Sequence, residues 1–332
     1  MMGLQANSQA RNFALVILSI GLLATVFYGF HRQDRMCLID PGNRDDPRDV
    51  RIVPNETPSL NIGKGKALSQ EEIDGLFKET TAQDDPVLIR YIAQSRIDLP
   101  SYQPYDLDGP SHRDFSRGQS GLAEKLLPDV ERGFFVECGA LDGEGRSNSL
   151  YFERERHWEG LLIEADPLNY KDVVRRKRKA YASNSCLSPF PYPTKLKYKQ
   201  SKNTGKAMHS EEEVKKYSNK DVLQVDCFTL YSFMLALNRT VIDFFSLDVE
   251  GSELPILKTI PFDKLTIKVL TVEFVHGQGD PKAEIVDYLK QFNYVHKGTV
   301  TRGDWTANDV VFVRKDFDKG LEFKTIRNYS PP

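Results

Sequence analysis

Residues 134–145 read FFVECGALDGEG, an apolar run followed at once by a turn rich in glycine and acidic residues. The run is short and continuous, as in a strand that is buried on both faces. Gly139 and Gly143 let the backbone turn sharply and approach a ligand closely. A second apolar run, residues 160–163, ends at Glu164. We therefore predict a strand–turn–helix–strand unit in which Glu164 closes the second strand.

The same alternation of strands and helices continues towards the C-terminus. We predict helices at 146–156, 167–179, 253–259 and 283–292, and further strands at 181–186, 241–247, 267–274, 294–300 and 310–313. Short buried strands separated by helices indicate an α/β domain with a parallel, doubly wound sheet. Residues 190–220 interrupt the pattern with a lysine-rich insertion. We interpret this insertion as a solvated surface loop rather than as a binding patch.

The N-terminal part of the chain has a different character. Residues 13–30 carry no charge and are almost wholly apolar. A helix of this length spans a thin bilayer. No small-residue cleavage site follows the segment, so we favour a retained membrane anchor over a cleaved signal peptide or a buried globular helix. The flanking Lys and Arg residues are nearly balanced, and they leave the orientation open.

These patterns divide the chain into segments. Ser69 and the pair Asp85-Pro86 are typical helix starts, so two short helices are expected before the main domain. We predict a tail at 1–12, a membrane helix at 13–30, a stem at 31–66, short helices and a loop at 67–118, the α/β domain at 119–316 and a second tail at 317–332.

Charge and cysteine content limit the partners and the compartment. The formal net charge of −2 gives no indication of a nucleic-acid partner. Cys138 lies in an apolar run and is expected to be a small buried filler. A disulfide between Cys186 and Cys227 is a hypothesis that fits an oxidising compartment. No His/Cys spacing indicates zinc, and we predict no metal site. Three Asn-x-Ser/Thr sequons, at Asn55, Asn238 and Asn328, would be glycosylation acceptors in a lumenal domain.

The carboxyl ends of the predicted strands carry the chemistry, because open α/β sheets bind their ligands there. A carboxylate at Glu164 can accept hydrogen bonds from both hydroxyls of a ribose, which indicates a cofactor that contains a nucleoside. Glu137, Asp142 and Glu144 would repel a pyrophosphate but suit a cationic ligand. The charges therefore favour S-adenosylmethionine over NAD. Alternatively, the glycines only form a tight turn and Glu164 only caps the next helix.

Four segments carry a family resemblance: FVECGALDGEGRSNSLYFE, GLLIEADPLNY, FFSLDVEGSELPILKTI and VLTVEF. Together they resemble the FkbM-type methyltransferase domain, over roughly residues 133–313. The resemblance implies a seven-stranded methyltransferase sheet that uses S-adenosylmethionine to methylate hydroxyl oxygens. The element Asp-Val-Glu-Gly-Ser-Glu at 248–253 is its most specific part.

A closer resemblance extends over the anchor, the stem and the run DDPVLIRYIAQ that precedes the domain. These segments are similar to the invertebrate Star group of single-pass membrane proteins. The resemblance implies a cytosolic N-terminus and a lumenal, glycosylated domain in the endoplasmic reticulum, Golgi, endosomes or plasma membrane. It further implies a role in vesicle transport of growth-factor precursors and in receptor signalling. We favour this trafficking role on a methyltransferase fold, with an active O-methyltransferase as the alternative.

The FkbM resemblance also implies roles for individual residues. For the cofactor we expect Glu137, Gly139 and Gly143 at the methionine end, Glu164 at the ribose, and Asp166 and Asn184 at the adenine. Asp142 is a further cofactor-binding candidate in the same turn. Asp248 and Glu250 are expected beside the transferred methyl group, and His276 follows the next strand. O-methylation needs a base within hydrogen-bond reach of the acceptor. We rank Asp248 first and His276 second for that role.

Overall fold

The computed structural model describes residues 67–109, 115–276, 279–303, 307–323 and 326–327, all within one compact unit, Ser59–Pro332. The predicted membrane helix at 13–30 and the predicted stem at 31–66 lie outside the described residues, as do the sequons at Asn55 and Asn328. Within the described part of the chain, no helix combines the length and the apolar character that crossing a membrane requires.

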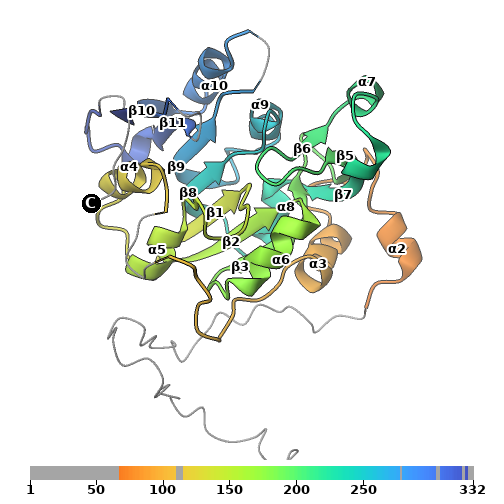
Figure 1. Cartoon of the computed structure of the whole chain (residues 1–332). Coiled ribbons are helices and arrows are strands. Elements are labelled where there is room, and N and C mark those ends of the chain that lie inside the picture. Colours follow the sequence, from red (N-terminus) through yellow and green to blue (C-terminus); the bar gives the residue numbers. More distant parts are fainter. Residues whose placement is uncertain (1–66, 110–114, 277–278, 304–306, 324–325, 328–332) are drawn as a thin grey trace, which may run out of the picture. The chain divides into compact units, whose positions relative to one another are not determined.

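An eight-stranded sheet forms the centre of the described domain (Figure 1). Its order is β12-β10-β11-β9-β8-β1-β2-β3. The strands are β1 (Phe134–Cys138), β2 (Glu159–Glu164), β3 (Tyr181–Asn184), β8 (Val241–Leu247), β9 (Thr266–Glu273), β10 (Tyr294–Thr301), β11 (Asn308–Arg314) and β12 (Ile326–Arg327). Apart from the short β12, each corresponds to a strand predicted from the sequence.

The sheet is mixed rather than wholly parallel. The strands β3, β2, β1, β8 and β9 run parallel to one another. In contrast, β11 is antiparallel to both β9 and β10. The prediction of a parallel sheet is therefore wrong at this edge. The connection between β10 and β11, residues 302–307, is too short for the crossover that a parallel pair requires.

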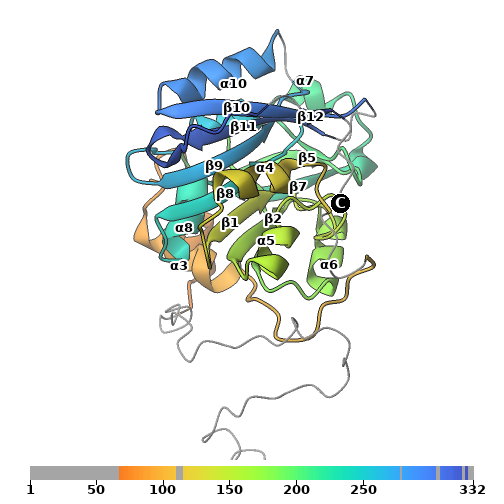
Figure 2. The same cartoon turned by 90° about the vertical axis from the view of Figure 1, so that its left-hand side faces the viewer.

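Helices cover both faces of this sheet, as a doubly wound fold requires (Figure 2). One face packs against α3 (Pro86–Ser95), α8 (Leu230–Ala236), α9 (Glu253–Leu257) and α10 (Pro281–Lys290), and the other against α4 (Gln119–Leu126), α5 (Leu150–Glu155) and α6 (Pro167–Arg175). Successive side chains of a strand point to opposite faces. Accordingly, Phe134 and Val136 of β1 belong to the first core and Phe135 to the second.

The two predicted N-terminal helices are present with their predicted caps. The hydroxyl of Ser69 accepts a hydrogen bond at the start of α2 (Gln70–Asp74), and the carboxylate of Asp85 does the same for α3. Leu88 and Ile92 of α3 are fully buried in the core of the main domain. Residues before 119 therefore contribute to the packing of the α/β domain itself.

The lysine-rich insertion supplies two strands, β5 and β6, of a second, four-stranded sheet, so its interpretation as a surface loop is wrong. The strands, in the order β4-β7-β5-β6, are β4 (Cys186–Leu187), β7 (Val222–Phe228), β5 (Thr194–Lys199) and β6 (Lys206–Met208), with α7 (Glu211–Val214) following β6. In β5 the lysines alternate with buried Leu196 and Tyr198. That alternation is the pattern of a half-buried strand, which the many lysines conceal.

A disulfide joins Cys186 of β4 to Cys227 of β7, as hypothesised from the sequence. The two residues are direct neighbours in the parallel ladder, and their Cα atoms are 4.4 Å apart. Cys138 is a free, buried thiol in the core. The bond therefore ties the second sheet together next to the end of β3.

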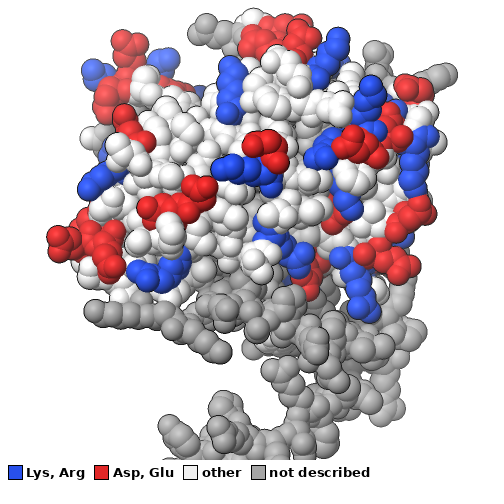
Figure 3. Space-filling view, turned by 180° about the vertical axis from the view of Figure 1, so that it is seen from behind, with Lys and Arg blue, Asp and Glu red and all other residues white. Residues whose placement is uncertain are grey.

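Acidic and basic side chains are interspersed over the face shown in Figure 3. Neither sign gathers there into a continuous patch. The chain's near-neutral formal charge of −2 is thus also balanced locally on this face.

Candidate functional site

A pocket of about 370 Å³ lies at the carboxyl ends of β1, β2, β8 and β9. The strands β1 and β8 are neighbours in the sheet, although β2 and β3 lie between them in the sequence. Open α/β sheets bind their ligands at such a switch point in strand order. The tip of the β5–β6 hairpin, residues 202–205, also lines the pocket.

Gly139 brings the two sides of the switch point into contact. Its φ is +84°, and a Cβ atom at this position would lie 1.9 Å from the backbone oxygen of Asp248. Its N–H donates to the oxygen of Ile163 at 3.0 Å. Only glycine allows β1, β2 and the end of β8 to meet this closely.

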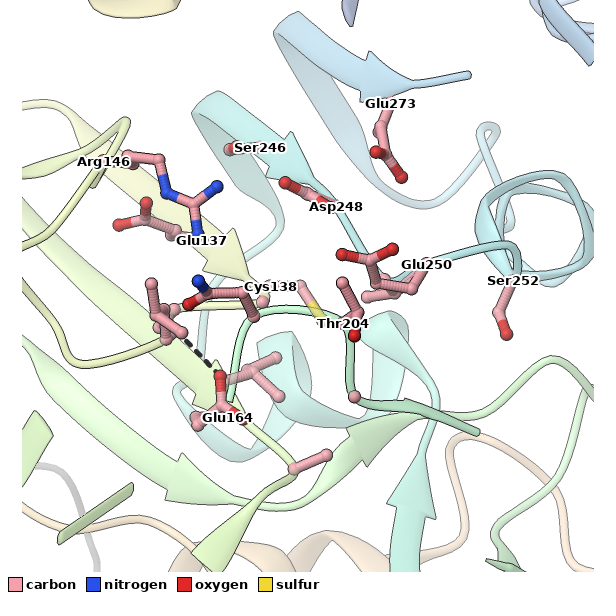
Figure 4. Close-up of a pocket in the computed structure, with 18 of the residues that line it drawn as sticks. Glu137, Cys138, Arg146, Glu164, Thr204, Ser246, Asp248, Glu250, Ser252 and Glu273 are labelled. Carbon is pink, nitrogen blue, oxygen red and sulfur yellow. Dashed lines mark hydrogen bonds between the residues drawn. The ribbon is translucent and has the colours of Figure 1, made fainter. Parts of the chain in front are cut away.

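Glu164 closes β2 inside the pocket, as the sequence predicts, and is 4% exposed. One carboxylate oxygen accepts from the N–H of Leu141 and the other from the N–H of Asp166, both at 2.8 Å. Figure 4 shows Glu164 and one hydrogen bond to its carboxylate. Burial raises the pKa of Glu164 to about 7. Each carboxylate oxygen has two acceptor sites, so each can still accept one further hydrogen bond.

Glu137 also lines the pocket, but its carboxylate is bound by the loop before α5. It accepts from the N–H of Asn148 at 2.6 Å and from the hydroxyls of Ser147 and Ser149. Arg146 in the same loop has a φ of +61°. The loop therefore replaces the first turns of the predicted helix at 146–156, and α5 begins only at Leu150.

Asp142 and Gly143 turn away from the pocket lining. The carboxylate of Asp142 accepts from the N–H of Gly145 at 2.6 Å and pairs with Arg176 of α6 at 3.3 Å. These bonds hold the pKa of Asp142 below its usual range, against the effect of burial. Gly143 has a φ of +78° and packs against Val173 of α6. Both residues shape the turn rather than the cavity.

Asp166 and Asn184 likewise lie outside the residues that line the pocket. Asp166 caps α6 by accepting from the N–H of Leu168, and it also accepts from the side chain of Gln200, both at 2.8 Å. The amide of Asn184 donates to the backbone oxygen of Glu164 at 2.8 Å. These two residues therefore stabilise the segment that carries Glu164 without lining the pocket themselves.

Asp248, Glu250 and His276 come together at the other end of the pocket, as the sequence predicts. The Nε2 atom of His276 is 2.6 Å from a carboxylate oxygen of Glu250. Loss of solvent, together with the neighbouring Glu250 carboxylate, raises the pKa of Asp248 to about 6. Burial lowers the pKa of His276, so its imidazole is mainly neutral at pH 7.

Glu273 completes this end of the pocket and was missed at the sequence level. Figure 4 shows the side chains of Asp248, Glu250 and Glu273 directed towards one another from the ends of β8 and β9. Burial, then the charges of Asp248 and Glu253, raise the pKa of Glu273 to about 11. Its Oε2 atom is buried and has no hydrogen-bond partner among the described residues. Glu273 ends the observed strand β9, whereas the predicted strand at 267–274 ran one residue further, to Phe274, so the rule that found Glu164 passed over Glu273.

Two buried amides also line the pocket with one atom unsatisfied. Asn148 is 6% exposed, and its Oδ1 atom has no partner among the described residues. Asn308 is 7% exposed, and its Nδ2 atom has none. Neither residue stands out in the sequence, because Asn148 lies in a loop and Asn308 begins an antiparallel strand. Their place in the pocket depends on the tertiary fold.

The hairpin tip is held over the Glu164 end of the pocket. The side-chain amide of Asn169, in α6, donates to the backbone oxygen of Lys202 at 2.9 Å. Gln200 bonds Asp166 from the same hairpin. The supposed surface loop therefore supplies one wall of the cavity.

The sheet and the pocket at its switch point define an α/β domain of the methyltransferase type. Residues 137–295 match the model of a family described as the Methyltransferase FkbM domain. This match agrees with the resemblance to the FkbM methyltransferase domain found in the sequence. The match lies inside the span of 133–313 expected from the sequence.

Comparison with solved structures gives partial overlaps at low identity. The METTL16 methyltransferase domain is 12% identical with a TM-score of 0.37, and the match covers 60% of this chain and 66% of that one. Methyltransferase FkbM from Methylobacillus flagellatus KT is 16% identical with a TM-score of 0.38, covering 60% and 49%. The human methyltransferase 10 domain containing protein is 10% identical with a TM-score of 0.34, covering 63% and 88%.

The chain thus spans less than two thirds of the first two of these structures, and we draw no functional conclusion from the three likenesses. No curated protein matched the chain. None of these comparisons concerns the Star group, so that closer resemblance stays a prediction.

Proposed function

We propose that the domain binds S-adenosylmethionine and catalyses transfer of its methyl group to an oxygen acceptor. The observation that carries the proposal is Glu164. Its carboxylate lines the pocket at the end of β2 and is fixed there by two backbone N–H groups, one on each oxygen. A ribose offers two adjacent hydroxyls, which such a carboxylate can accept side by side.

The residues present fit the rest of this cofactor. The cavity of about 370 Å³ lies within the usual range for small-molecule sites. Ile163, Leu187 and Tyr198 give apolar surface beside Glu164, where an adenine ring would pack. The unsatisfied Oδ1 atom of Asn148 is an acceptor for an ammonium group. Acidic side chains around the cavity favour a ligand that carries positive charge.

The cofactor, when bound, supplies a methyl group that is activated by a sulfonium. At the other end of the pocket, Asp248 takes the proton that the acceptor hydroxyl loses as the new carbon–oxygen bond forms and the carbon–sulfur bond breaks. A pKa of about 6 leaves Asp248 ionised at neutral pH and more basic than an ordinary aspartate. Nε2 of His276 is engaged with Glu250, which favours Asp248 as the base.

The proposal is tested by titrating the purified full-length protein with S-adenosylmethionine in a calorimeter. We expect saturable binding, and a loss of affinity of about 100-fold in Glu164→Gln, because two hydrogen bonds to an ionised acceptor are weakened. Glu159→Gln is the matched control, since Glu159 begins the same strand but pairs with Arg239 outside the pocket. A folded wild-type protein that does not bind the cofactor would contradict the proposal.

We further propose that the domain faces the lumen of the secretory pathway, tethered by the predicted helix at 13–30. Two observations support this. The Cys186–Cys227 disulfide is typical of oxidising compartments. The sequon residue Asn238 is exposed, so it is open to glycosylation. We expect a glycosidase-sensitive mass shift in protein from secretory cells, which is reduced in Asn238→Gln. An unglycosylated protein with free thiols at both cysteines would exclude this location.

A Star-like role in the trafficking of membrane-bound growth-factor precursors is the second candidate, and the same two observations favour it over a cytosolic enzyme. The calorimetric titration separates the candidates. A lumenal, folded protein without affinity for S-adenosylmethionine would leave transport of cargo from the endoplasmic reticulum as the function. A precursor that is retained in the endoplasmic reticulum when the protein is depleted, and released when wild-type protein is restored, would support it.

A further inference from the structure

The acidic end of the pocket contains a set of side chains with the spacing of metal ligands. One donor atom from each of Glu250, Glu273 and His276 lies within 4.8 Å of the other two. For a cation with metal–ligand bonds of about 2.1 Å, adjacent ligand atoms lie roughly 3 Å apart and opposite ones roughly 4.2 Å apart. The three donor atoms are therefore close enough together to share one divalent cation.

A second group, Asp248, Glu253 and Glu273, has the same spacing, but one of its carboxylates is already hydrogen-bonded to the backbone. The carboxylate of Glu253 accepts from the N–H of Val249 at 2.9 Å and from the N–H of Gly251 at 3.0 Å, and it does not line the pocket. It is committed to the turn after β8. Asp248 and Glu273 do line the pocket, so Asp248 borders the first group without needing Glu253.

The cluster is also short of partners. Among the ion pairs of the described residues, only His276 pairs with Glu250 or Glu273, at 2.6 and 4.0 Å. One oxygen of Glu273 is buried without a hydrogen bond. Burying carboxylates together without a compensating cation is costly. A bound cation would give the unpartnered Glu273 oxygen a ligand to coordinate.

A separate observation beside the cluster indicates a ligand there. Asn308 is 7% exposed, lines the pocket, and carries a buried amide atom with no partner among the described residues. Its backbone oxygen accepts from the N–H of Phe274, the residue after Glu273, so Asn308 lies at the end of the sheet where β9 and β11 meet the pocket, one residue beyond the Asp309–Glu273 pair. An amide can turn its oxygen towards a cation or donate to a water that the cation holds.

We propose that Glu250, Glu273 and His276 bind a divalent cation at the acceptor end of the pocket, next to Asp248. Imidazole together with two carboxylates favours Mn²⁺, Fe²⁺ or Zn²⁺ over Ca²⁺. Resting on the proposed methyl transfer, the cation selects acceptors whose hydroxyl or carboxylate oxygen can coordinate it. Coordination also holds that oxygen beside Asp248 and lowers the pKa of a hydroxyl.

The test uses the full-length protein after treatment with a chelator, titrated with Mn²⁺ alone and followed by electron paramagnetic resonance. We expect one saturable site in the wild type. His276→Ala and Glu273→Gln should each weaken Mn²⁺ binding by about 10- to 100-fold or more. His157→Ala and Glu211→Gln are the matched controls, because both residues are exposed and lie outside the pocket. His276 is partly exposed, so its variant is expected to fold.

Binding of S-adenosylmethionine is measured on the same variants, so that the two proposals fail separately. Retained cofactor affinity in His276→Ala with lost Mn²⁺ affinity supports the cation site, as does retained Mn²⁺ affinity in Glu164→Gln. Mn²⁺ binding in a protein that does not bind the cofactor would leave the cation site standing while the methyl-transfer proposal fails. Absence of saturable Mn²⁺ binding, or equal binding by His276→Ala and Glu273→Gln, would overturn the site. Binding of cadaverine in place of Mn²⁺ would instead assign this end to a cationic acceptor.

Discussion

The two ends of the pocket treat their carboxylates in different ways. At the β1–β2 end, the oxygens of Glu137 and Glu164 all accept hydrogen bonds from backbone N–H groups or hydroxyls of adjoining loops. At the β8–β9 end, Glu250 and Glu273 face one another and His276, and one oxygen of Glu273 has no partner among the described residues.

The difference indicates that the two ends of the pocket have different functions. Carboxylates fixed by backbone groups cannot move far, so the β1–β2 end is a preorganised site for a ligand of constant shape. Clustered carboxylates with few partners are held in place by the fold at an energetic cost. Proteins retain such an energetic cost where the groups bind a ligand reversibly, which here is the acceptor and its cation. The predictions below test this difference, from the largest expected effect to the smallest.

The sharpest test of this difference is Asp248→Asn. Removing the base should lower the rate of methyl transfer by about 10²- to 10⁴-fold while S-adenosylmethionine binding stays close to that of the wild type. Rates from single-turnover assays and affinities from calorimetry measure the two effects separately. Asp287→Asn, an exposed change on α10, is the control. A normal rate in Asp248→Asn together with a lost rate in His276→Ala would assign the base to His276 instead.

The β1–β2 end should show its own pH dependence. Because burial raises the pKa of Glu164 to about 7, its carboxyl gains a proton, and loses acceptor capacity, as the pH falls through neutrality. The groups that face it are the Asp166 carboxylate, the Asn169 amide, the Cys138 thiol and the Tyr198 phenol. The raised pKa values of the thiol and the phenol keep both neutral in this range.

We therefore expect the association constant for 5′-methylthioadenosine to fall by about tenfold per pH unit below pH 7 and to level off above pH 8. This probe has the ribose and the adenine but no group that titrates in this range. Glu164→Gln should give a flat profile. An equally sloped profile in that variant would show that another group governs binding at this end.

The smallest expected effect concerns the hairpin that covers the preorganised end. Asn169→Ala removes the hydrogen bond to the backbone oxygen of Lys202, worth about 1 kcal/mol. Cofactor affinity should fall by about fivefold, mostly through faster dissociation, which stopped-flow measurements resolve. Asn219→Ala, at an exposed position outside the pocket, should change neither rate. An unchanged dissociation rate in Asn169→Ala would mean that the tip does not close over the ligand.

Much of the fold follows from local patterns that the chain carries in short stretches. The strands at 134–138 and 241–247 were predicted to the residue, because continuous apolar runs end there at polar or glycine positions. The caps at Ser69 and Asp85 were found because each depends on neighbours within one helical turn. The direction of β11 was not predicted, because the hydrophobic pattern of a buried strand is the same for a parallel and an antiparallel strand.

The site shows the same limit. Glu164, Asp248, Glu250 and His276 were placed correctly in the pocket, because the carboxyl ends of parallel strands meet at one edge. Asp142 lies outside the pocket lining. Its ion pair with Arg176, which depends on how α6 packs against the turn, could not be foreseen from the sequence. Gly143, Asp166 and Asn184 likewise lie outside the pocket lining, and their assignment to the cofactor stays a prediction.

By itself, then, the sequence indicated the long strands of the main sheet, several of its helices, a cysteine pair for the disulfide, and the acidic residues at the ends of β2 and just after β8. Hydrophobic periodicity and helix capping depend on residues close together in the chain, so both can be predicted from the sequence. Only the tertiary structure decided that the lysine-rich hairpin packs over the pocket and that Asn308 reaches the pocket where β9 and β11 end. Those arrangements depend on contacts between residues far apart in the chain, whose free energy no local pattern records.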